Sequence, residues 1–173
     1  MSGAEAGAER DWEAWARRFE SIDGPDAFAA LFAPGGRFCD PVTPWTTDLL
    51  KVARDTDAIF PDWNQRVDRI RGGRDWAVFE WTGTGTFHAG EGKAGVPISM
   101  TGATVLDVDA DGKVTAWRDY LDTNEPTQQI QKGMAAAGLD LIAIEATPVD
   151  LGWAKSTILR ALGRKPSSST GLS

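Results

Sequence analysis

Two aspartates stand among aromatic and aliphatic residues in short segments that alternate as strands do. Asp40 ends the segment 37–40 (RFCD), and Asp119 lies within the segment 117–121 (WRDYL). An apolar setting disfavours an ionised carboxylate and raises its pKa. A carboxyl group that titrates near neutral pH can give or take a proton during a reaction. Asp40 and Asp119 are therefore the candidate catalytic residues.

Two carboxyl groups in one cavity separate their pKa values, which leaves one base and one acid near neutral pH. Such a pair enolises a ketone, or protonates an epoxide while it deprotonates an attacking hydroxyl. Each aspartate also has a structural interpretation. In this interpretation Asp40, which precedes a proline, only caps a loop. Asp119 only accepts a hydrogen bond from a helix N-terminus or from the indole of Trp12 or Trp15.

The strands that carry the aspartates also predict the wall of a pocket, because side chains two residues apart point to the same face. Phe38 shares a face with Asp40, and Trp117 shares one with Asp119. Two further strands bring aromatic, sulfur and hydroxyl side chains to this face. The predicted ligand-binding residues are Phe38, Trp81, Thr104, Trp117, Phe79 and Met100.

The elements that position these residues follow from periodicity and turn signals. Helices are expected at 10–22, from Pro25 through Phe32, at 48–59 with Thr46 or Thr47 as the cap, at 125–137 and at 151–164. Strands are expected at 37–40, 63–71, 75–87, 96–109 and 113–122, with a hairpin at Gly72-Gly73. Helices that precede a run of long strands predict an α+β fold. We expect N-terminal helices packed on a curved antiparallel sheet, forming a cone with an internal pocket, followed by a C-terminal helical extension.

Composition limits the classes of function. The chain has 173 residues, a net charge of −7 and only 18 lysines and arginines, which argues against nucleic acid as a partner. Eight tryptophans and seven phenylalanines are more aromatic residues than one small core needs, and they favour a pocket for a hydrophobic ligand. The first residues do not form a signal peptide and no stretch has the length of a membrane span. A cytoplasmic protein without a membrane partner is expected.

The remaining reactive residue types are sparse. Cys39 is the only cysteine, and it should point away from Asp40 as a small buried hydrophobe. His88 is the only histidine and lies beside a glycine-rich turn, so we expect it at the surface. These residues do not supply a metal-ligand cluster, and no metal is predicted. The predicted organisation is a disordered tail at 1–9, a cone domain at 10–125, a helical extension at 126–165 and a second disordered tail at 166–173.

Four segments in this order resemble the SnoaL-like branch of the nuclear transport factor fold. Residues 32–42 resemble the strand that carries the general base of ketosteroid isomerases, and 60–63 resemble the turn before the long hairpin. Residues 81–88 are similar to a recurring SnoaL-like strand. Residues 117–122 are similar to the last strand of limonene-epoxide hydrolases, whose catalytic aspartate matches Asp119. The resemblance covers about residues 10–125 and implies a cone-shaped fold that forms homodimers.

The same resemblance shows which family machinery is missing. Trp81-Thr82-Gly83 stands where limonene-epoxide hydrolases carry Arg-x-Asp, and their Tyr and Asn positions hold Phe38 and Asp40. In ketosteroid isomerases the oxyanion Tyr would fall near Ala16 and the second acid near Thr104. SnoaL-type cyclases use an Asp with a His to remove a proton from an activated carbon.

The predicted function is cofactor-free acid–base chemistry on a hydrophobic small molecule, as in polyketide cyclases and isomerases, with Asp40 and Asp119 transferring protons. One alternative is an epoxide-opening hydrolase or cyclase that uses the same two acids. The other alternative is a non-catalytic module that binds a small molecule.

Overall fold

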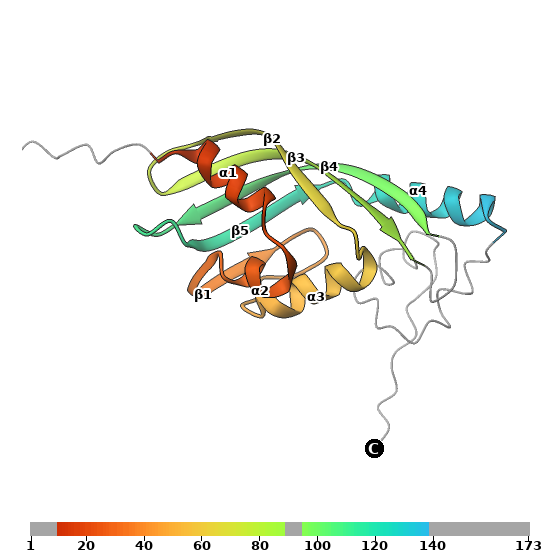
Figure 1. Ribbon diagram of the computed structural model, residues 1–173, viewed down its shortest axis with the longest axis horizontal. Helices are drawn as coiled ribbons and strands as arrows, with labels where there is room; N and C mark the ends of the chain where they lie inside the picture. The colour runs from red at the N-terminus through yellow and green to blue at the C-terminus, as the bar shows by residue number, and fades with distance from the viewer. Residues whose placement is uncertain (1–9, 89–94, 139–173) are drawn as a thin grey trace, which may run out of the picture.

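The structure is a computed structural model that describes residues 10–88 and 95–138 (Figure 1). Its helices are α1 (Trp12–Glu20), α2 (Gly24–Ala29), α3 (Leu49–Ile59) and α4 (Asn124–Ala136). Its strands are β1 (Phe32–Cys39), β2 (Asn64–Gly72), β3 (Trp76–Phe87), β4 (Val96–Val108) and β5 (Val114–Leu121). The predicted α+β fold is confirmed.

The five strands form one curved sheet in the order β1-β5-β4-β3-β2. Strands β2 to β5 are antiparallel neighbours, as the hairpin signals predict. Strand β1 pairs parallel to β5, so the sheet is mixed and the expectation of a wholly antiparallel sheet is wrong for this strand. No hairpin joins β1 to β5, and α3 with three strands intervenes, so nothing in the local chain imposes an antiparallel direction.

Strand alternation separates an inner from an outer face. Every second residue of β3 from Ala77 to Phe87 is turned to the inner face, and Phe79 and Trp81 are among its buried side chains. Strand β4 alternates in the same way over most of its length. A sheet that alternates like this buries one face and leaves the other to solvent, so helices are needed on the inner face only.

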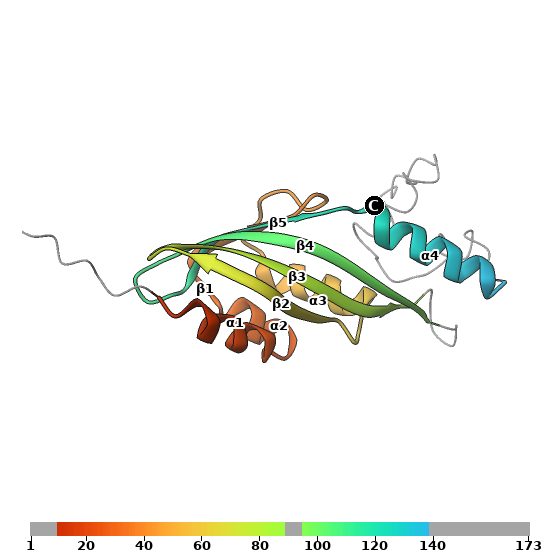
Figure 2. The same cartoon turned by 90° about the horizontal axis from the view of Figure 1, so that it is seen from above.

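Helix α1 covers the inner face with aromatic side chains. Asp11 caps the helix by accepting a hydrogen bond from the Ala14 N–H at 2.8 Å. The rings of Trp15 and Phe19 lie 5.4–6.2 Å, between centroids, from those of Phe79 and Trp117. In Figures 1 and 2, α1 and α2 lie together beside the sheet and α4 lies at its far end. The aromatic contacts join α1 to β3 and β5, which carry much of the site.

Three boundary predictions are wrong. Helix α2 ends at Ala29, and Phe32 starts β1 instead of continuing the helix. This strand is longer than the predicted 37–40 because residues 32–36 join it across an irregular register near Gly35, whose φ is +78°. The cap of α3 is Asp48 rather than Thr46 or Thr47, since its carboxylate accepts a hydrogen bond from the Lys51 N–H at 3.1 Å.

The helix predicted at 125–137 is α4, which packs on β4. Gln129 accepts a hydrogen bond from the Ser99 N–H at 2.8 Å and donates one to the Ser99 carbonyl at 2.6 Å. The tails 1–9 and 166–173 and the helix predicted at 151–164 lie outside the described residues. None of the helices in the described ranges has the length and apolarity needed to cross a membrane.

Two glycines make room for tryptophans on the inner face. A Cβ atom on Gly102 would lie 2.3 Å from Cζ2 of Trp81, and one on Gly83 would lie 2.2 Å from Cη2 of Trp63. Gly102 is the register partner of Trp81. The indole of Trp81 therefore lies over the backbone of β4, where no other residue type leaves space for it.

We predict that Gly102→Ala displaces Trp81 and lowers the free energy of unfolding by about 1–3 kcal/mol, the usual cost of overpacking. Urea unfolding followed by circular dichroism measures this change. Thr101→Ala, at the exposed neighbouring position, is the control and should change stability by less than about 0.5 kcal/mol. Equal stability of Gly102→Ala and the control would contradict the packing argument.

Candidate functional site

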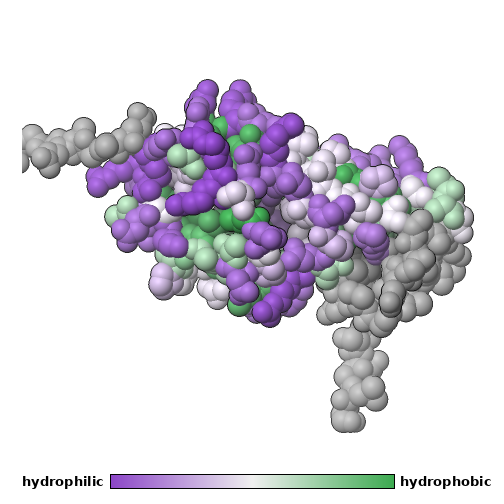
Figure 3. All heavy atoms as spheres, in the orientation of Figure 1, coloured by the Kyte–Doolittle hydropathy of each residue, from purple (hydrophilic) through white to green (hydrophobic). Residues whose placement is uncertain are grey.

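A cavity of about 510 Å³ lies between the inner face of the sheet and the helices. This size is typical of sites for small organic molecules. Its described lining residues include Phe28, Phe38, Asp40, Thr43, Lys51, Val52, Asp55, Thr56, Asp57, Phe60, Trp63, Gln65, Trp81, Met100, Trp117, Asp119 and Leu121. Figure 3 shows apolar atoms at the surface between α1 and α2, on a face that is otherwise largely polar.

Asp119 is held by a chain of hydrogen bonds that crosses three strands. Its Oδ1 accepts hydrogen bonds from the hydroxyl of Thr104 and from Nε1–H of Trp117, the latter at 2.7 Å. Thr104, which is fully buried, accepts a hydrogen bond from Nε1–H of Trp81 at 3.0 Å. The carboxyl group of Asp119 therefore has a fixed position at the wall of the cavity.

The direction of this chain decides which oxygen of Asp119 carries a proton. An indole N–H only donates, so the Thr104 oxygen accepts from Trp81 and its own hydrogen must point at Asp119. Oδ1 of Asp119 thus receives two hydrogens. When the carboxyl group is neutral, its proton resides on Oδ2.

Asp119 is neutral over much of the pH range. Its pKa is raised to about 7: burial is the main cause, the hydrogen bonds from Thr104 and Trp117 oppose the rise, and the nearby charge of Asp40 adds to it. Desolvation outweighs the two donors because it penalises the charged form as a whole. At pH 7 the group is poised to give or take a proton.

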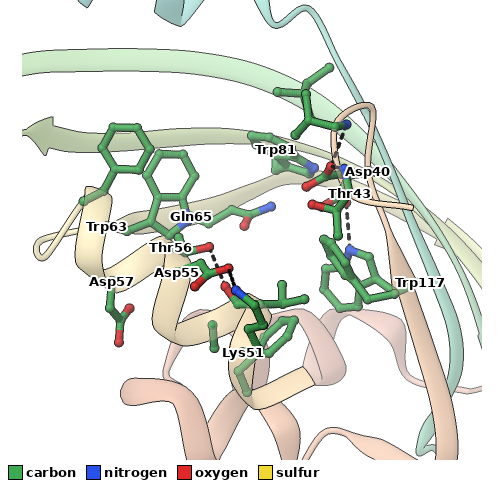
Figure 4. Close-up of a pocket in the computed structure, with 18 of the residues that line it drawn as sticks. Asp40, Thr43, Lys51, Asp55, Thr56, Asp57, Trp63, Gln65, Trp81 and Trp117 are labelled. Carbon is green, nitrogen blue, oxygen red and sulfur yellow. Dashed lines mark hydrogen bonds and ion pairs between the residues drawn. The ribbon is translucent and has the colours of Figure 1, made fainter. Parts of the chain in front are cut away.

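Asp40 is the second carboxyl group of the cavity, and its environment differs. Its Oδ1 accepts hydrogen bonds from the N–H groups of Val42 at 2.8 Å and Thr43 at 2.5 Å (Figure 4). Burial raises its pKa, while these backbone donors oppose the rise because they favour the ionised form. Asp40 is thus the more readily ionised member of the pair.

The structure brings six of the eight predicted site residues to the cavity wall and leaves two behind it. Asp40, Asp119, Phe38, Trp81, Trp117 and Met100 line the cavity. Phe79 lies in the core, against Trp15 and Phe19. Thr104 is buried behind the wall and bonds Asp119 instead of facing a ligand. The prediction that Phe79 and Thr104 line the cavity is wrong. Strand alternation predicts which face of the sheet a residue occupies, but not whether other side chains cover it there.

The structure confirms the loop-capping interpretation of Asp40 but not the predicted hydrogen-bond partner of Asp119. Asp40 does cap the loop that follows it, and it lines the cavity as well. The indole that bonds Asp119 belongs to Trp117, whereas that of Trp12 donates to the Gly73 carbonyl at 2.7 Å. The capping of a loop therefore does not remove Asp40 from the site.

The wall opposite the aspartates contains no residue predicted from the sequence. It comes from α3, the turn after it and the start of β2, and includes Thr56, Trp63 and Gln65 (Figure 4). The sequence pattern of residues 48–59 predicts a helix that covers the sheet, but it does not mark any of its side chains as part of a cavity. Alternation in β2 does place Gln65 on the same face as Val67, which marks it as an inward-pointing residue.

Cys39 and His88 stay outside the cavity. Cys39 is buried, and its sulfur accepts a hydrogen bond from the guanidinium of Arg118 at 3.3 Å on the far side of the strand from Asp40. His88 is exposed, as predicted. Within residues 10–88 and 95–138, no three His, Cys, Asp or Glu side chains gather in a way that would hold a metal ion.

Comparison with known proteins agrees with this geometry. The family model of the SnoaL-like domain matches residues 6–117, well over half of the chain. The chain belongs to the SnoaL-like domain family. No functionally curated protein matches it.

Solved structures share the SnoaL-like fold at low sequence identity. A protein of ketosteroid isomerase-like fold from Catenulispora acidiphila, in complex with trimethylamine, is 20% identical, with a TM-score of 0.58 over 75% of this chain and 92% of that one. A candidate polyketide cyclase from Acidithiobacillus ferrooxidans is 20% identical, with a TM-score of 0.58 over 77% and 99%. An epoxide hydrolase from M. tuberculosis, like limonene-epoxide hydrolases, is 18% identical, with a TM-score of 0.54 over 72% and 90%. The predicted membership of this fold superfamily is confirmed.

We predict that Asp119→Asn removes a pH dependence of stability. The folded protein keeps the proton of Asp119 up to about pH 7, whereas the unfolded chain releases it near 3.8. The free energy of unfolding of the wild type should therefore fall by up to about 4 kcal/mol as pH rises between these two values. Above pH 7 it should stay level. Urea unfolding at pH 4 to 8 measures the slope.

The asparagine variant imitates the neutral acid, so it should be more stable than the wild type at pH 8. Asp111→Asn, in the exposed turn before β5, serves as the control and should leave the wild-type slope in place. A wild-type slope that survives in Asp119→Asn would show that this carboxyl group is not the one responsible.

Proposed function

We propose that this protein is a cofactor-free acid–base enzyme of the cyclase or isomerase type, acting on a hydrophobic small molecule. The observation that carries the proposal is the presence of two carboxyl groups, Asp40 and Asp119, at the wall of one largely apolar cavity, one bonded by backbone N–H groups and the other by side chains within the sheet. Backbone N–H groups favour the ionised form of Asp40, while burial raises the pKa of Asp119 to about 7, so that a large share of it still carries a proton near neutral pH. Such a division is how paired carboxyl groups take separate roles.

In the proposed reaction Asp40 is the base and Asp119 is the acid. The carboxylate of Asp40 removes a proton from the carbon next to a carbonyl group, and Oδ2–H of Asp119 gives its proton to the carbonyl oxygen, which yields an enol. In an isomerisation, Asp40 returns its proton to a different carbon and Asp119 regains its own from the enol oxygen. In a cyclisation, the enol carbon attacks a second carbonyl carbon while the enol oxygen returns its proton to Asp119, and the new alkoxide takes the proton from Asp40.

The chain of hydrogen bonds behind Asp119 supports this assignment. Trp81 and Thr104 fix the hydrogen-bond direction so that the proton is held on Oδ2 rather than on Oδ1. Epoxide opening by the limonene-epoxide hydrolase mechanism is less well supported, because an arginine is absent from the described residues that line the cavity. A polyketide cyclase and an epoxide hydrolase among the structural neighbours share the fold, and the fold alone does not select the reaction.

We predict that the protein exchanges the acidic carbon-bound protons of a bicyclic ketone with solvent. The probe is 2-tetralone in D₂O, and deuterium uptake is followed by proton NMR. Asp40→Asn and Asp119→Asn should each slow the catalysed exchange by about 10²-fold or more, the usual loss when a general acid or base is removed. Because Asp119 must be protonated, the rate should fall as pH rises above about 7.

Asp111→Asn is the matched control and should exchange at the wild-type rate. Wild-type exchange in both site variants would sink the acid–base proposal. If the wild type itself does not accelerate exchange but binds the ketone, the cavity belongs to a non-catalytic binding module.

We further propose that the protein forms a homodimer through the outer face of the sheet. This face exposes large apolar side chains of three adjacent strands: 47% of Trp76, 37% of Val78, 38% of Val105 and 51% of Tyr120. Exposed apolar side chains that cluster on one surface are typical of an interface between proteins. A second copy of the chain is the occupant that the SnoaL-like resemblance favours.

Sedimentation equilibrium should accordingly give twice the chain mass of 18.6 kDa. Val105→Glu introduces a charge at the middle of this face and should produce a monomer. Ala58→Glu, at an exposed position of α3, should remain a dimer. A monomeric wild type would contradict the proposal.

A further inference from the structure

Two buried N–H groups lack a hydrogen-bond partner within the described part of the chain: Nε1 of Trp15 and Nε2 of Gln65. An unpartnered buried donor costs about 1–3 kcal/mol, so each one calls for an explanation. Trp15 sits in the aromatic core, away from the lining of the cavity. Gln65 lines the cavity, and its amide points into it (Figure 4). A ligand in the cavity can therefore satisfy the donor of Gln65.

Gln65 and the acid pair lie on different parts of the cavity wall. Gln65 is on β2, an edge strand, and Asp119 is on β5, with β3 and β4 between them. Adjacent strands are about 4.8 Å apart, so three spacings separate the two positions along the curved sheet. A ligand that contacts both residues therefore lies across the cavity between β2 and β5.

The charges around the cavity exclude one class of ligand. Apart from Asp40 and Asp119, the described lining contains four carboxylates: Glu20, Asp48, Asp55 and Asp57. Its one cationic side chain, Lys51, is paired with Asp55 at 2.6 Å. Burial, and then the neighbouring charge of Asp23, raises the pKa of Asp57, so negative charge is already disfavoured here. A carboxylate or phosphate on the ligand would add to this repulsion.

We propose that Gln65 determines specificity by donating a hydrogen bond from its side-chain amide to a carbonyl oxygen of an extended, uncharged ligand. This inference rests on the proposed function and names the substrate class of the same cavity, namely neutral polycyclic or multi-carbonyl ketones without an acidic group. The acid pair acts on one part of such a molecule, and Gln65 binds an oxygen on another part. The amide of Gln65 makes this selection by binding, not by chemistry.

The test uses three probes with one ring system: 9-fluorenone, fluorene and 9-fluorenone-4-carboxylate. Trp63, Trp81 and Trp117 line the cavity, so quenching of tryptophan fluorescence reports binding. The wild type should bind the ketone about tenfold more tightly than the hydrocarbon, the worth of one hydrogen bond to a buried donor. It should bind the carboxylate at least about tenfold more weakly than the neutral ketone.

Gln65→Met keeps the length of the side chain and removes its polar atoms. It should reduce the preference for ketone over hydrocarbon to about one. It should also leave the melting temperature unchanged or raise it, because an unpartnered buried donor is gone. Gln128→Met, the same substitution at an exposed position of α4 outside the cavity lining, is the matched control. This control should keep the ketone preference.

Three results would overturn the inference: no binding of the ketone by the wild type, an unchanged preference in Gln65→Met, or carboxylate binding as tight as ketone binding. If Asp119→Asn abolishes the preference and Gln65→Met does not, the carbonyl sits at the acid pair, and the proposed function stands while Gln65 loses its role. If the Gln65 results hold and the deuterium exchange test fails, the cavity selects neutral ketones without catalysis.

Discussion

The hydrogen bonds that converge on Oδ1 of Asp119 constrain three strands at once. Trp81 on β3 bonds Thr104 on β4, which bonds Asp119 on β5, and Trp117 on β5 completes the set. Each member has one possible direction of donation, so the network exists in a single arrangement. The inner face of the sheet, the position of the acid and the location of its proton all depend on this arrangement.

The two aspartates differ in where they stand in the fold. Asp40 stands at the end of a strand, where the chain turns and the backbone N–H groups of Val42 and Thr43 are free to bond it. Asp119 stands within a strand, where the backbone N–H groups serve the sheet, and only side chains can reach it. A carboxyl group with backbone donors favours ionisation, and one in an apolar wall resists it. Burial raises the pKa of both aspartates, and it raises that of Asp119 more, so Asp119 is the weaker acid.

The sequence predicts the order of elements and the faces of the strands, because alternation and turn residues are local signals. It therefore brings Asp40, Asp119, Trp81 and Trp117 to one face correctly. It does not predict how deeply a side chain is buried, because this depends on the residues that cover it. Thr104 is predicted at the cavity wall, but the indole of Trp81 covers it. The parallel pairing of β1 and the part played by Gln65 depend on contacts between distant segments, for which a single sequence carries no local signal.

The fit between glycines and tryptophans has a consequence for how such a cavity changes in evolution. Trp63 lies against Gly83 and Trp81 lies against Gly102. In each pair, the indole fills the space that a side chain at the glycine position would occupy. A larger residue at either glycine is tolerated only after its tryptophan has been replaced by a smaller residue. Replacement of the tryptophan alone leaves a void. Both single steps lose stability, although the exchange of both residues restores packing. The shape of this cavity is therefore expected to diverge by paired substitutions, and libraries of single variants would miss most of the accessible shapes.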